Sequence, residues 1–386
     1  MKNYKELESQ NIVHTYGRFD VCFESGQGSI LKDTSGKEYV DFTSGIGVNS
    51  LGYNNEKWVK AVAKQAASLQ HISNLYYTTP MIELAQSLVE KSGLSKVFFA
   101  NSGAEANEGM IKTARKTNES KHTIITLQNS FHGRTLATLT ATGQDVFHQH
   151  FGPFPEGFAY CPANDLDALK SMVNEDTLAI MMEMIQGEGG VMPLDYDFVQ
   201  GVKQICEEKD ILLLVDEVQT GIGRTGSFLC FQQYDILPDI ISVAKGIGGG
   251  LPLAAFIMGE KCKDVLQPGD HGTTFGGNPV SCAGGNVVME YMTEEFFQEV
   301  KEKGAYLRAR LEAIPHIVRV NGMGLMLGAQ LDEGIAVRDV INACNEKGAL
   351  FLSAKANLRC LPPLVITKEE IARGMDVLEE VLSNWK

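Results

Sequence analysis

The segment most suggestive of chemistry is SVAKGIGGGLPLAA, residues 242–255, in which Lys245 is the only charged residue. An ammonium group among apolar residues is costly to bury, so its pKa falls and the neutral amine can attack a carbonyl group. A nucleotide-binding P-loop also combines glycines with a lysine, but there the lysine follows the glycines and precedes Ser or Thr. Lys245 precedes its glycines, so the segment favours an amine nucleophile that forms a Schiff base.

Pyridoxal 5'-phosphate (PLP) is the common carbonyl partner of such a lysine, and its ring nitrogen needs a carboxylate. Asp216 follows the apolar run ILLLV, at the position where open α/β sheets place ligand-binding groups. Taken alone, this acid is equally consistent with a turn or a metal ligand. Because Lys245 follows one expected strand later, we interpret Asp216 as the pyridinium contact.

Two other segments could hold the phosphate and the ring of PLP. In FANSGAEANEGM, residues 101–104 separate an expected strand from an expected helix, and Gly103 allows close approach to the anion site at the helix N-terminus. In NSFHGRT, Phe131 could stack on the pyridine ring and Arg134 could bind a substrate carboxylate. The alternatives are a simple helix cap for the first segment, and a buried Phe with a surface Arg for the second.

The elements that position these residues are short apolar runs alternating with helical segments. Helices are expected at 105–117 and 197–209, and the runs cover residues 97–100, 123–127, 179–183, 211–215, 240–243 and 253–258. The runs are too short for helices and apolar on both faces, which indicates strands covered on two sides. The pattern predicts an α/β fold with a mostly parallel central sheet and helices on both faces.

The remaining sequence predicts a smaller α+β unit. One helix is expected from Asn286 to Lys303, with Val288, Met292 and Phe296 forming a core-facing stripe. Strands are expected over 317–331 and 350–364, and a final helix over 367–382. We expect residues 1–50 to join residues 286–386 in this smaller unit. Residues 51–285 would form the large cofactor-binding unit, and a cleft would lie between the two units.

Composition excludes several classes of partner. The 386 residues carry 34 Lys and Arg against 48 Asp and Glu, a net charge of -14, which disfavours nucleic acid and anionic membranes. The chain shows no signal peptide and no run long enough to span a bilayer, so a cytoplasmic protein is expected. The 8 cysteines form no C-x-x-C pair and are interpreted as core residues. His148 and His150 are weak evidence for a metal, and none is expected.

Over nearly its whole length the sequence resembles the class III, ornithine-type aminotransferases, which are PLP enzymes of fold type I. The resemblance is carried by SGAEANE, SFHGRT, QGEGG, DEVQTGIGRTG, AKGIGGGLPL, HGTTFGGNP and NLRCLPPL. Within this family, FHGRTL, DEVQTG and KGIGGGLPL are most similar to the branch that acts on N2-acetylornithine in bacterial arginine biosynthesis. The resemblance implies the PLP-dependent transferase fold, transamination with 2-oxoglutarate, and a homodimer with shared active sites.

The resemblance also implies roles for matching residues in cofactor binding. Lys245 would carry the Schiff base, Asp216 would contact the pyridinium nitrogen, and Gln219 would bond the phenolic oxygen. The phosphate would be held by Gly103 and Ala104 of one subunit together with Thr274 of the neighbouring subunit.

For the substrates, the resemblance implies two arginines and a gate. Arg134, helped by Thr273, would bind the α-carboxylate of the amino donor, and Arg359 would bind that of glutamate or 2-oxoglutarate. Glu188 would pair with Arg359 in one half-reaction and move aside in the other. The free amine of Lys245 would act as general base and acid, and the kinetics would be ping-pong.

Other activities remain open at this point. Succinylornithine, free ornithine, N-succinyl-diaminopimelate and 4-aminobutyrate are alternative amino donors, and FHGRT alone does not distinguish them. An aminomutase would use the same cofactor pocket without 2-oxoglutarate. A non-catalytic binding protein is disfavoured because Lys245, Asp216 and both arginines are present.

Overall fold

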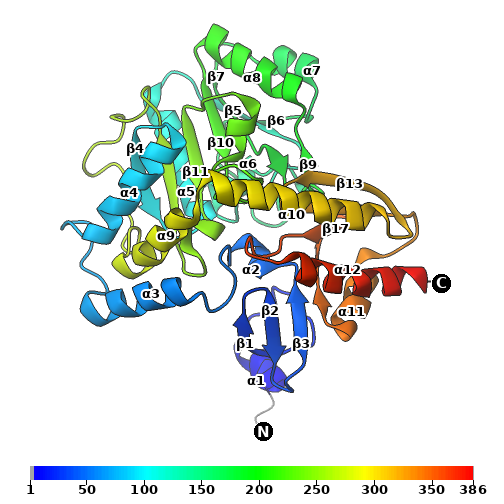
Figure 1. The fold of residues 1–386 in the computed structure, drawn as a ribbon. Helices are drawn as coiled ribbons and strands as arrows, with labels where there is room; N and C mark the ends of the chain where they lie inside the picture. The colour runs from blue at the N-terminus through cyan, green and yellow to red at the C-terminus, as the bar shows by residue number, and fades with distance from the viewer. Residues whose placement is uncertain (1–3, 386) are drawn as a thin grey trace.

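A central sheet of seven strands forms the middle of the molecule in the computed structural model, which describes residues 4–385 (Figure 1). Its spatial order is β4-β12-β11-β10-β7-β5-β6. The strands are β4 Lys96–Ala100, β5 Thr123–Leu127, β6 Phe158–Cys161, β7 Thr177–Met182, β10 Leu212–Asp216, β11 Ile240–Val243 and β12 Ala254–Met258. All run parallel except β12, which pairs antiparallel with β11 and β4. The expected mostly parallel sheet is confirmed, whereas the direction of β12 and the existence of β6 were not predicted.

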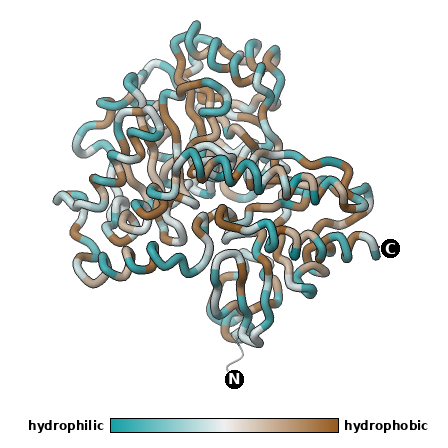
Figure 2. The backbone as a smooth tube through the Cα atoms, in the orientation of Figure 1, coloured by the Kyte–Doolittle hydropathy of each residue, from teal (hydrophilic) through white to brown (hydrophobic). Residues whose placement is uncertain are grey.

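Helices cover both faces of this sheet because alternate residues of the strands are buried on opposite sides. Helix α5 (Gly103–Thr117) packs on the face where Leu212 and Leu214 lie. Helices α4 (Thr79–Ser92) and α8 (Tyr196–Lys209) pack on the other face, where Leu213 and Val215 lie. Figure 2 shows hydrophobic residues along the central strands and hydrophilic residues interspersed along the outer helices. Burial on both faces explains why the strand sequences are almost uninterrupted apolar runs.

A second group of elements lies beside the central sheet and contains both ends of the described chain. One four-stranded sheet has the order β13-β14-β17-β16, and another has the order β1-β2-β3-β15. Because β3 pairs with β15, the N-terminal strands lie against the C-terminal part of the chain, as Figure 1 shows. The strands are β1 Phe23–Gln27, β2 Ile30–Asp33, β3 Glu38–Asp41, β13 Ile317–Met323, β14 Met326–Leu331, β15 Ala349–Leu350, β16 Leu352–Ala354 and β17 Asn357–Cys360. The division at residues 50 and 285 stays a prediction.

Two expectations about this part of the chain were wrong in detail. The single helix over 286–303 is two helices, α9 (Pro279–Tyr291) and α10 (Glu294–Glu312). The chain breaks there because the side chain of Thr293 accepts a hydrogen bond from Phe296 N at 3.3 Å and caps α10. The hydrophobic stripe is nevertheless buried as expected. Similarly, 317–331 is a hairpin of β13 and β14 that turns at Gly324, and 350–364 contains the short strands β16 and β17.

The final helix, α12 (Lys368–Ser383), agrees with its prediction within one residue, and Thr367 and Glu370 form its capping box. The other helices are α1 Tyr4–Asn11, α2 Ser44–Gly47, α3 Glu56–Ser68, α6 Leu136–Ala141, α7 Leu166–Met172 and α11 Val337–Lys347. A two-stranded hairpin of β8 (Ile185–Gln186) and β9 (Met192–Pro193) follows β7, and short 3-10 turns are η1 Asp145–Phe147, η2 Cys230–Tyr234 and η3 Lys245–Gly248.

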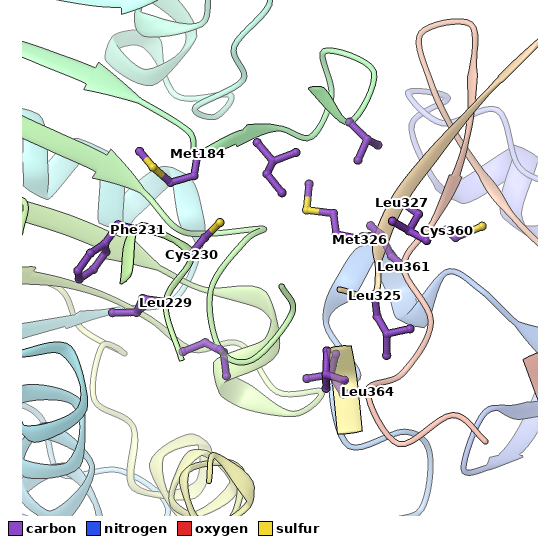
Figure 3. Packing of buried hydrophobic residues seen from close by; sticks show 14 of the residues in the cluster. Met184, Leu229, Cys230, Phe231, Leu325, Met326, Leu327, Cys360, Leu361 and Leu364 are labelled. Carbon is purple, nitrogen blue, oxygen red and sulfur yellow. The ribbon is translucent and has the colours of Figure 1, made fainter. Parts of the chain in front are cut away.

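One hydrophobic cluster runs from the central sheet into the C-terminal elements. Figure 3 shows Met184 and Phe231 on one side of this cluster and Met326, Leu361 and Leu364 on the other. Each of the eight cysteines has a free thiol, and seven are buried, as expected of core residues; Cys22 is exposed. No helix between residues 4 and 385 combines the length and apolarity that a bilayer crossing requires.

Candidate active site

The carboxyl ends of the central strands meet at a cavity of about 470 Å³. Parallel strands place their carboxyl ends at one edge of a sheet, so segments far apart in the sequence converge there. The segments that follow β4, β5, β7, β10 and β11 all contribute to the lining. Seven sequence-predicted residues line the cavity: Gly103, Ala104, Phe131, Arg134, Asp216, Gln219 and Lys245.

Lys245 follows β11 and begins the 3-10 turn η3. Its φ of 49° lies in the left-handed region, which residues with a β-carbon adopt at a cost of about 1 to 2 kcal/mol. Its amine makes no hydrogen bond or ion pair with any residue in the described range 4–385. Burial lowers the pKa of the Lys245 ammonium below its usual value, and Glu188 and Asp216 oppose this shift. The lysine is therefore a poorly solvated amine that is available to a ligand.

The glycines after Lys245 serve packing. A β-carbon on Gly249 would lie 2.7 Å from Nε1 of Trp58, and the same indole nitrogen donates to Gly248 O at 3.2 Å. Gly249 also has a φ of 60°, which favours glycine. The run GIGGG thus gives Trp58 of α3 room to pack beside the lysine turn, which agrees with the rejection of a nucleotide P-loop.

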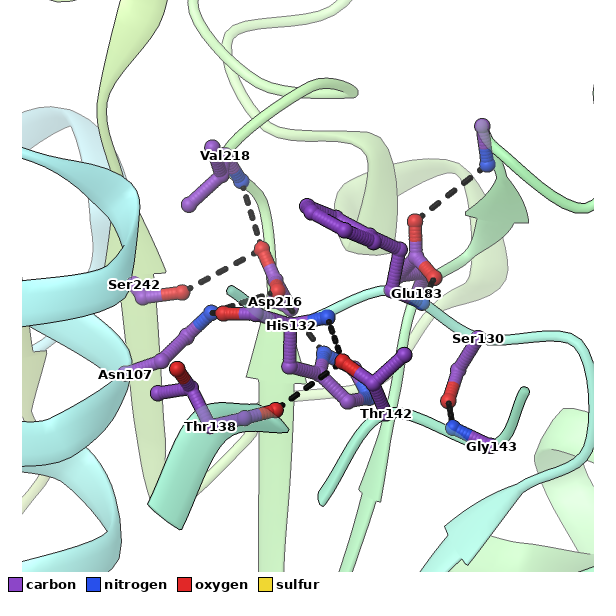
Figure 4. A network of polar contacts seen from close by, with 12 residues as sticks. Asn107, Ser130, His132, Thr138, Thr142, Gly143, Glu183, Asp216, Val218 and Ser242 are labelled. Atoms are coloured by element: carbon purple, nitrogen blue, oxygen red, sulfur yellow. Dashed lines mark hydrogen bonds and ion pairs between the residues drawn. The ribbon is translucent and has the colours of Figure 1, made fainter. Parts of the chain in front are cut away.

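Asp216 is held from both oxygens at the end of β10 (Figure 4). Oδ1 accepts from Val218 N at 2.9 Å and from Ser242 Oγ at 3.4 Å. Oδ2 accepts from Asn107 Nδ2 at 2.7 Å and lies 2.9 Å from His132 Nδ1. The side chain is only 4% exposed, so these contacts replace water and hold the carboxylate in one orientation.

Two members of this network received no role from the sequence. Asn107 also donates to His132 O at 2.7 Å, so it holds both Asp216 and the histidine. Asn107 lies one helical turn after Gly103 on α5, and this spacing was a signal that could have placed it on the cavity side. His132 stands beside Phe131 in FHGR, but nothing in its local sequence indicates contact with an aspartate 84 residues away.

The N-terminus of α5 forms one end of the cavity. Ser102 caps the helix by accepting from Glu105 N at 3.2 Å, while Asn101 bonds the Glu105 carboxylate. The first backbone N–H groups of a helix have no partner within it, and here they belong to Gly103 and Ala104. A β-carbon at Gly103 would lie 2.8 Å from a methyl group of Val218. The unpaired donors favour an anion at this end, and the close packing against Val218 accounts for the glycine at position 103.

Phe131 and Arg134 line the cavity from the loop that follows β5. The Arg134 guanidinium carbon lies 4.1 Å from the ring centre of Phe147 and 5.5 Å from that of Phe131. Arg134 has no ion pair or hydrogen bond with the described residues. Its guanidinium group is therefore oriented by aromatic rings while its donors stay free for a carboxylate.

Arg359 and Glu188 form an ion pair next to the cavity, outside its lining. Arg359 Nη1 lies 2.5 Å from Glu188 Oε1, and Nη2 lies 3.4 Å from Oε2. Nη1 also donates to Gln219 Oε1 at 3.2 Å, and Gln219 is a lining residue. The gate pair expected from the sequence is thus formed, and one amide side chain links it to the cavity.

The two predicted threonines do not line this cavity. Thr273 Oγ1 accepts from Asn101 Nδ2 at 3.2 Å, which places it beside the segment that precedes α5. Thr274 is exposed, and its expected contact with a neighbouring subunit stays a prediction.

Glu183 is a lining residue that the sequence analysis missed. Glu183 directly follows the buried strand β7, and Asp216 similarly stands at the end of the buried strand β10. The sequence AIMME therefore contained the same signal, an acidic residue at the end of an apolar run. Its carboxylate accepts from Phe131 N at 2.9 Å and from Gly187 N at 3.2 Å. The pKa of Glu183 is raised to about 7, mainly by burial. His132 opposes this rise, and Asp216 adds to it.

The family model of class III aminotransferases (Aminotransferase class-III) matches residues 12–382. The chain belongs to this family. It is a PLP-dependent aminotransferase of fold type I, and it acts on a small-molecule amino donor and acceptor.

Individual relatives of this class III aminotransferase match nearly its whole length. It is 52% identical over 385 residues to an acetylornithine aminotransferase of Haemophilus ducreyi, covering 98% of each chain. The crystal structure of N-acetylornithine aminotransferase from Stenotrophomonas maltophilia is similar with a TM-score of 0.84 and 35% identity, covering 98% of each chain. The ornithine aminotransferase from Toxoplasma gondii gives a TM-score of 0.94 at 29% identity, over 98% of this chain and 94% of that one.

The residues of this class III aminotransferase fit PLP. The cavity holds an amine without a partner, a carboxylate fixed by four contacts, and a helix N-terminus with free N–H groups. PLP needs an amine for its aldehyde, an anion for its ring nitrogen and donors for its phosphate. The family and the geometry therefore agree on the cofactor.

Proposed function

We propose that the chain catalyses the transamination of N2-acetyl-L-ornithine with 2-oxoglutarate, which yields N-acetyl-L-glutamate 5-semialdehyde and L-glutamate in arginine biosynthesis. The relatives that are 42–52% identical over nearly the full length and are named acetylornithine aminotransferases support this substrate. The observation that carries the proposal is the Arg359–Glu188 pair beside a cavity that also contains Arg134. Such a site can alternate between a substrate with one carboxylate and a dicarboxylate.

Lys245 is proposed to form the covalent bond with the cofactor and to transfer the proton. Bound PLP supplies an aldehyde for primary amines and a pyridinium ring that withdraws electrons. Lys245 Nζ accepts a proton from the amine-bearing carbon of the donor and returns it on the path to the product, which its lowered pKa favours. Asp216 would hold the proton at the ring nitrogen, and Phe131 would orient the ring by aromatic contact.

Arg359 and Glu188 are proposed to act as a charge switch. When the amino donor binds, Glu188 neutralises Arg359, so no charge is left unpaired next to the apolar stem of the substrate. When 2-oxoglutarate binds, its α-carboxylate replaces Glu188 as the partner of Arg359. Arg134, which has no ion pair within residues 4–385, would bind the single carboxylate of the amino donor in one half-reaction and the distal carboxylate of 2-oxoglutarate in the other.

A panel of amino donors tests the substrate. N2-acetylornithine, succinylornithine, ornithine, N-succinyl-diaminopimelate and 4-aminobutyrate are each offered with 2-oxoglutarate, and kcat/KM is measured. The highest value is expected for N2-acetylornithine. Turnover of 4-aminobutyrate at an equal or higher rate would contradict the assignment, and product formation without 2-oxoglutarate would indicate an aminomutase.

Borohydride reduction tests the covalent role of Lys245. Reduction of the holoenzyme followed by peptide mapping is expected to place the reduced cofactor on Lys245. The matched control is Lys245→Ala, which should bind no cofactor covalently. A reduced adduct on another lysine would show that the proposed chemistry is wrong.

The chain is further proposed to be a cytoplasmic homodimer with shared active sites, each completed by Thr274 of the partner. Exposed apolar side chains support this: Leu75 is 86% exposed and Tyr77 93% exposed, and Phe275, next to Thr274, is also exposed. A surface of this kind is typical of an interface. Sedimentation of the holoenzyme is expected to give twice the mass of one chain, and a monomer that is fully active would contradict the shared site.

A further inference from the structure

Two segments that carry substrate-binding residues meet beside Glu183. The FHGR loop (residues 128–135) follows β5 and carries Phe131 and Arg134. The β8–β9 hairpin (residues 185–193) follows β7 and carries Glu188 in its turn. Neither segment is part of the central sheet, so their relative position depends on the contacts between them.

Glu183 contacts both segments with one carboxylate. Oε1 accepts from Phe131 N of the FHGR loop at 2.9 Å, and Oε2 accepts from Gly187 N of the β8–β9 hairpin at 3.2 Å. Figure 4 shows Glu183 beside the Asp216 and His132 network, with a dashed line to a backbone nitrogen. Because both acceptor oxygens belong to one rigid group, the two backbone N–H groups are kept a fixed distance apart.

Other contacts show how close the two segments are. Gln186 Nε2 of the hairpin donates to Gln128 O of the FHGR loop at 2.8 Å. A β-carbon on Gly189 would lie 2.8 Å from Asn129 O, so the hairpin turn packs directly on the loop. The hairpin in turn contacts Arg359, which donates to Gly187 O at 3.5 Å. A displacement of Gly187 would therefore move both the gate and its arginine.

We propose that Glu183 is a positioning residue that joins the FHGR loop to the β8–β9 hairpin and thereby keeps Arg134 and the Glu188–Arg359 pair at the separation that a dicarboxylate requires. The inference rests on the proposed function, because it assigns both arginines to substrate carboxylates. Glu183 acts through backbone atoms of the two segments. In this way it determines how strongly the enzyme distinguishes acceptor substrates that differ in length and charge.

The surroundings of Glu183 explain why a carboxylate serves here. Two neighbouring titratable groups affect the pKa of Glu183: His132 lowers it and Asp216 raises it. Glu183 in turn raises the pKa of Lys245. A glutamine has one acceptor oxygen, and its NH2 group would face a backbone N–H in one of the two positions. Substitution of Glu183 by Gln therefore removes one of the two contacts and leaves an unpaired donor.

Hydrogen exchange tests the contacts directly. In Glu183→Gln, amide exchange in the FHGR loop or in the β8–β9 hairpin is expected to be at least about tenfold faster than in the wild-type holoenzyme, which is the factor for one lost hydrogen bond. The matched control is Glu217→Gln, a second buried carboxylate whose hydrogen bonds go to Phe231 N at 2.7 Å and to Thr220 Oγ1 at 2.5 Å, and to neither segment. In Glu217→Gln, exchange in both segments should equal that of the wild type. If Glu183→Gln also exchanges at the wild-type rate, the proposal is overturned.

Acceptor discrimination tests the consequence. The ratio of kcat/KM for 2-oxoglutarate to that for pyruvate, which lacks the distal carboxylate, is expected to fall at least about fivefold in Glu183→Gln. A purely structural role would lower both values by the same factor and leave the ratio unchanged, because a smaller folded fraction cancels in it. An unchanged ratio in Glu183→Gln, with the wild type preferring 2-oxoglutarate, would overturn the inference.

The two proposals can fail separately. If the wild-type enzyme does not prefer 2-oxoglutarate to pyruvate, the proposed function fails, while hydrogen exchange still decides whether Glu183 joins the two segments. If Glu183→Gln does not fold, Glu183→Asp provides the second variant, since its side chain is one methylene shorter and cannot keep both contacts. Faster exchange in either segment of Glu183→Asp supports the proposal, and exchange equal to wild type overturns it.

Discussion

Asp216 and Arg359 are both buried charges of the active site, but they are held in different ways. Asp216 has four contacts, from Asn107, His132, Val218 and Ser242, and all four come from the large sheet or its adjoining segments. Arg359 has one charged partner, Glu188, whose side chain is 30% exposed and has no other hydrogen bond within the described residues. One charge is fixed by many neighbours, and the other is neutralised by a single group that can leave.

The difference follows from what each charge must bind. The ring nitrogen of the cofactor stays in place through both half-reactions, so a carboxylate oriented in advance binds it without further reorganisation. The two substrates alternate, so the arginine needs a partner that can be exchanged for a substrate carboxylate. A pair as rigid as that of Asp216 would oppose this exchange.

The largest expected effect is at the fixed charge. In Asp216→Asn, kcat is expected to fall at least about a thousandfold, or about 4 kcal/mol, because the ring nitrogen loses its charge-assisted partner. The effect should be the same for every amino donor, as measured by kcat on the donor panel. A loss that depends on the donor would show that Asp216 acts on the substrate rather than on the cofactor.

A second effect concerns the stability of the fixed region. Glu217, beside Asp216, is fully buried, and burial raises its pKa to about 7. An unfolded Glu titrates near pH 4.3, so the folded state retains the proton between these values and loses stability as the pH rises through about 7. The loss between pH 5 and pH 8 is about 3 kcal/mol.

Urea unfolding at pH 5 and pH 8 measures this contribution. The decrease in unfolding free energy from pH 5 to pH 8 is expected to be about 3 kcal/mol smaller in Glu217→Gln than in the wild type, because Gln does not titrate. Equal decreases in the two proteins would mean that Glu217 is ionised in the fold throughout this range.

A third effect separates the exchangeable charge from the fixed one. In Arg359→Lys, KM for 2-oxoglutarate is expected to rise about 30-fold, or about 2 kcal/mol, because lysine cannot form a bidentate contact. The rate of the donor half-reaction, followed by the cofactor spectrum, should change less than about threefold. The control is Arg319→Lys, an exposed arginine of β13 that lines no part of the site. Equal losses in both half-reactions would contradict the switch.

The smallest effect tests how much redundancy the fixed charge has. Ser242 makes the longest of the four contacts of Asp216, at 3.4 Å. In Ser242→Ala, kcat is expected to fall less than about fivefold, below 1 kcal/mol, because three shorter contacts remain. A loss as large as that of Asp216→Asn would show that the network cannot tolerate a missing member.

Local patterns predicted most of the central sheet and several of the residues that line the cavity. Asp216 and Lys245 follow uninterrupted apolar runs, and parallel strands necessarily bring such positions to one edge. The direction of β12 was not accessible in this way, because LAAFIM is apolar on both faces whichever way it runs. The break between α9 and α10 was missed because the stripe of Val288, Met292 and Phe296 continues across it.

The polar network around the site depends on contacts between distant segments. Asn107 and Asp216 are 109 residues apart, and Phe131 and Glu183 are 52 residues apart. No spacing rule relates such positions, since their proximity results from the order of strands in the sheet.

Local sequence patterns predicted most of the central strands and placed Lys245, Asp216 and the N-terminus of α5 at their carboxyl ends, because these features follow from hydrophobic periodicity and short-range backbone geometry. The folded structure was needed to show that His132 and Asn107 hold Asp216 and that Glu183 contacts two segments. Hydrogen bonds act over about 3 Å, so partners from different elements are defined only once the strands are ordered and the side chains are packed.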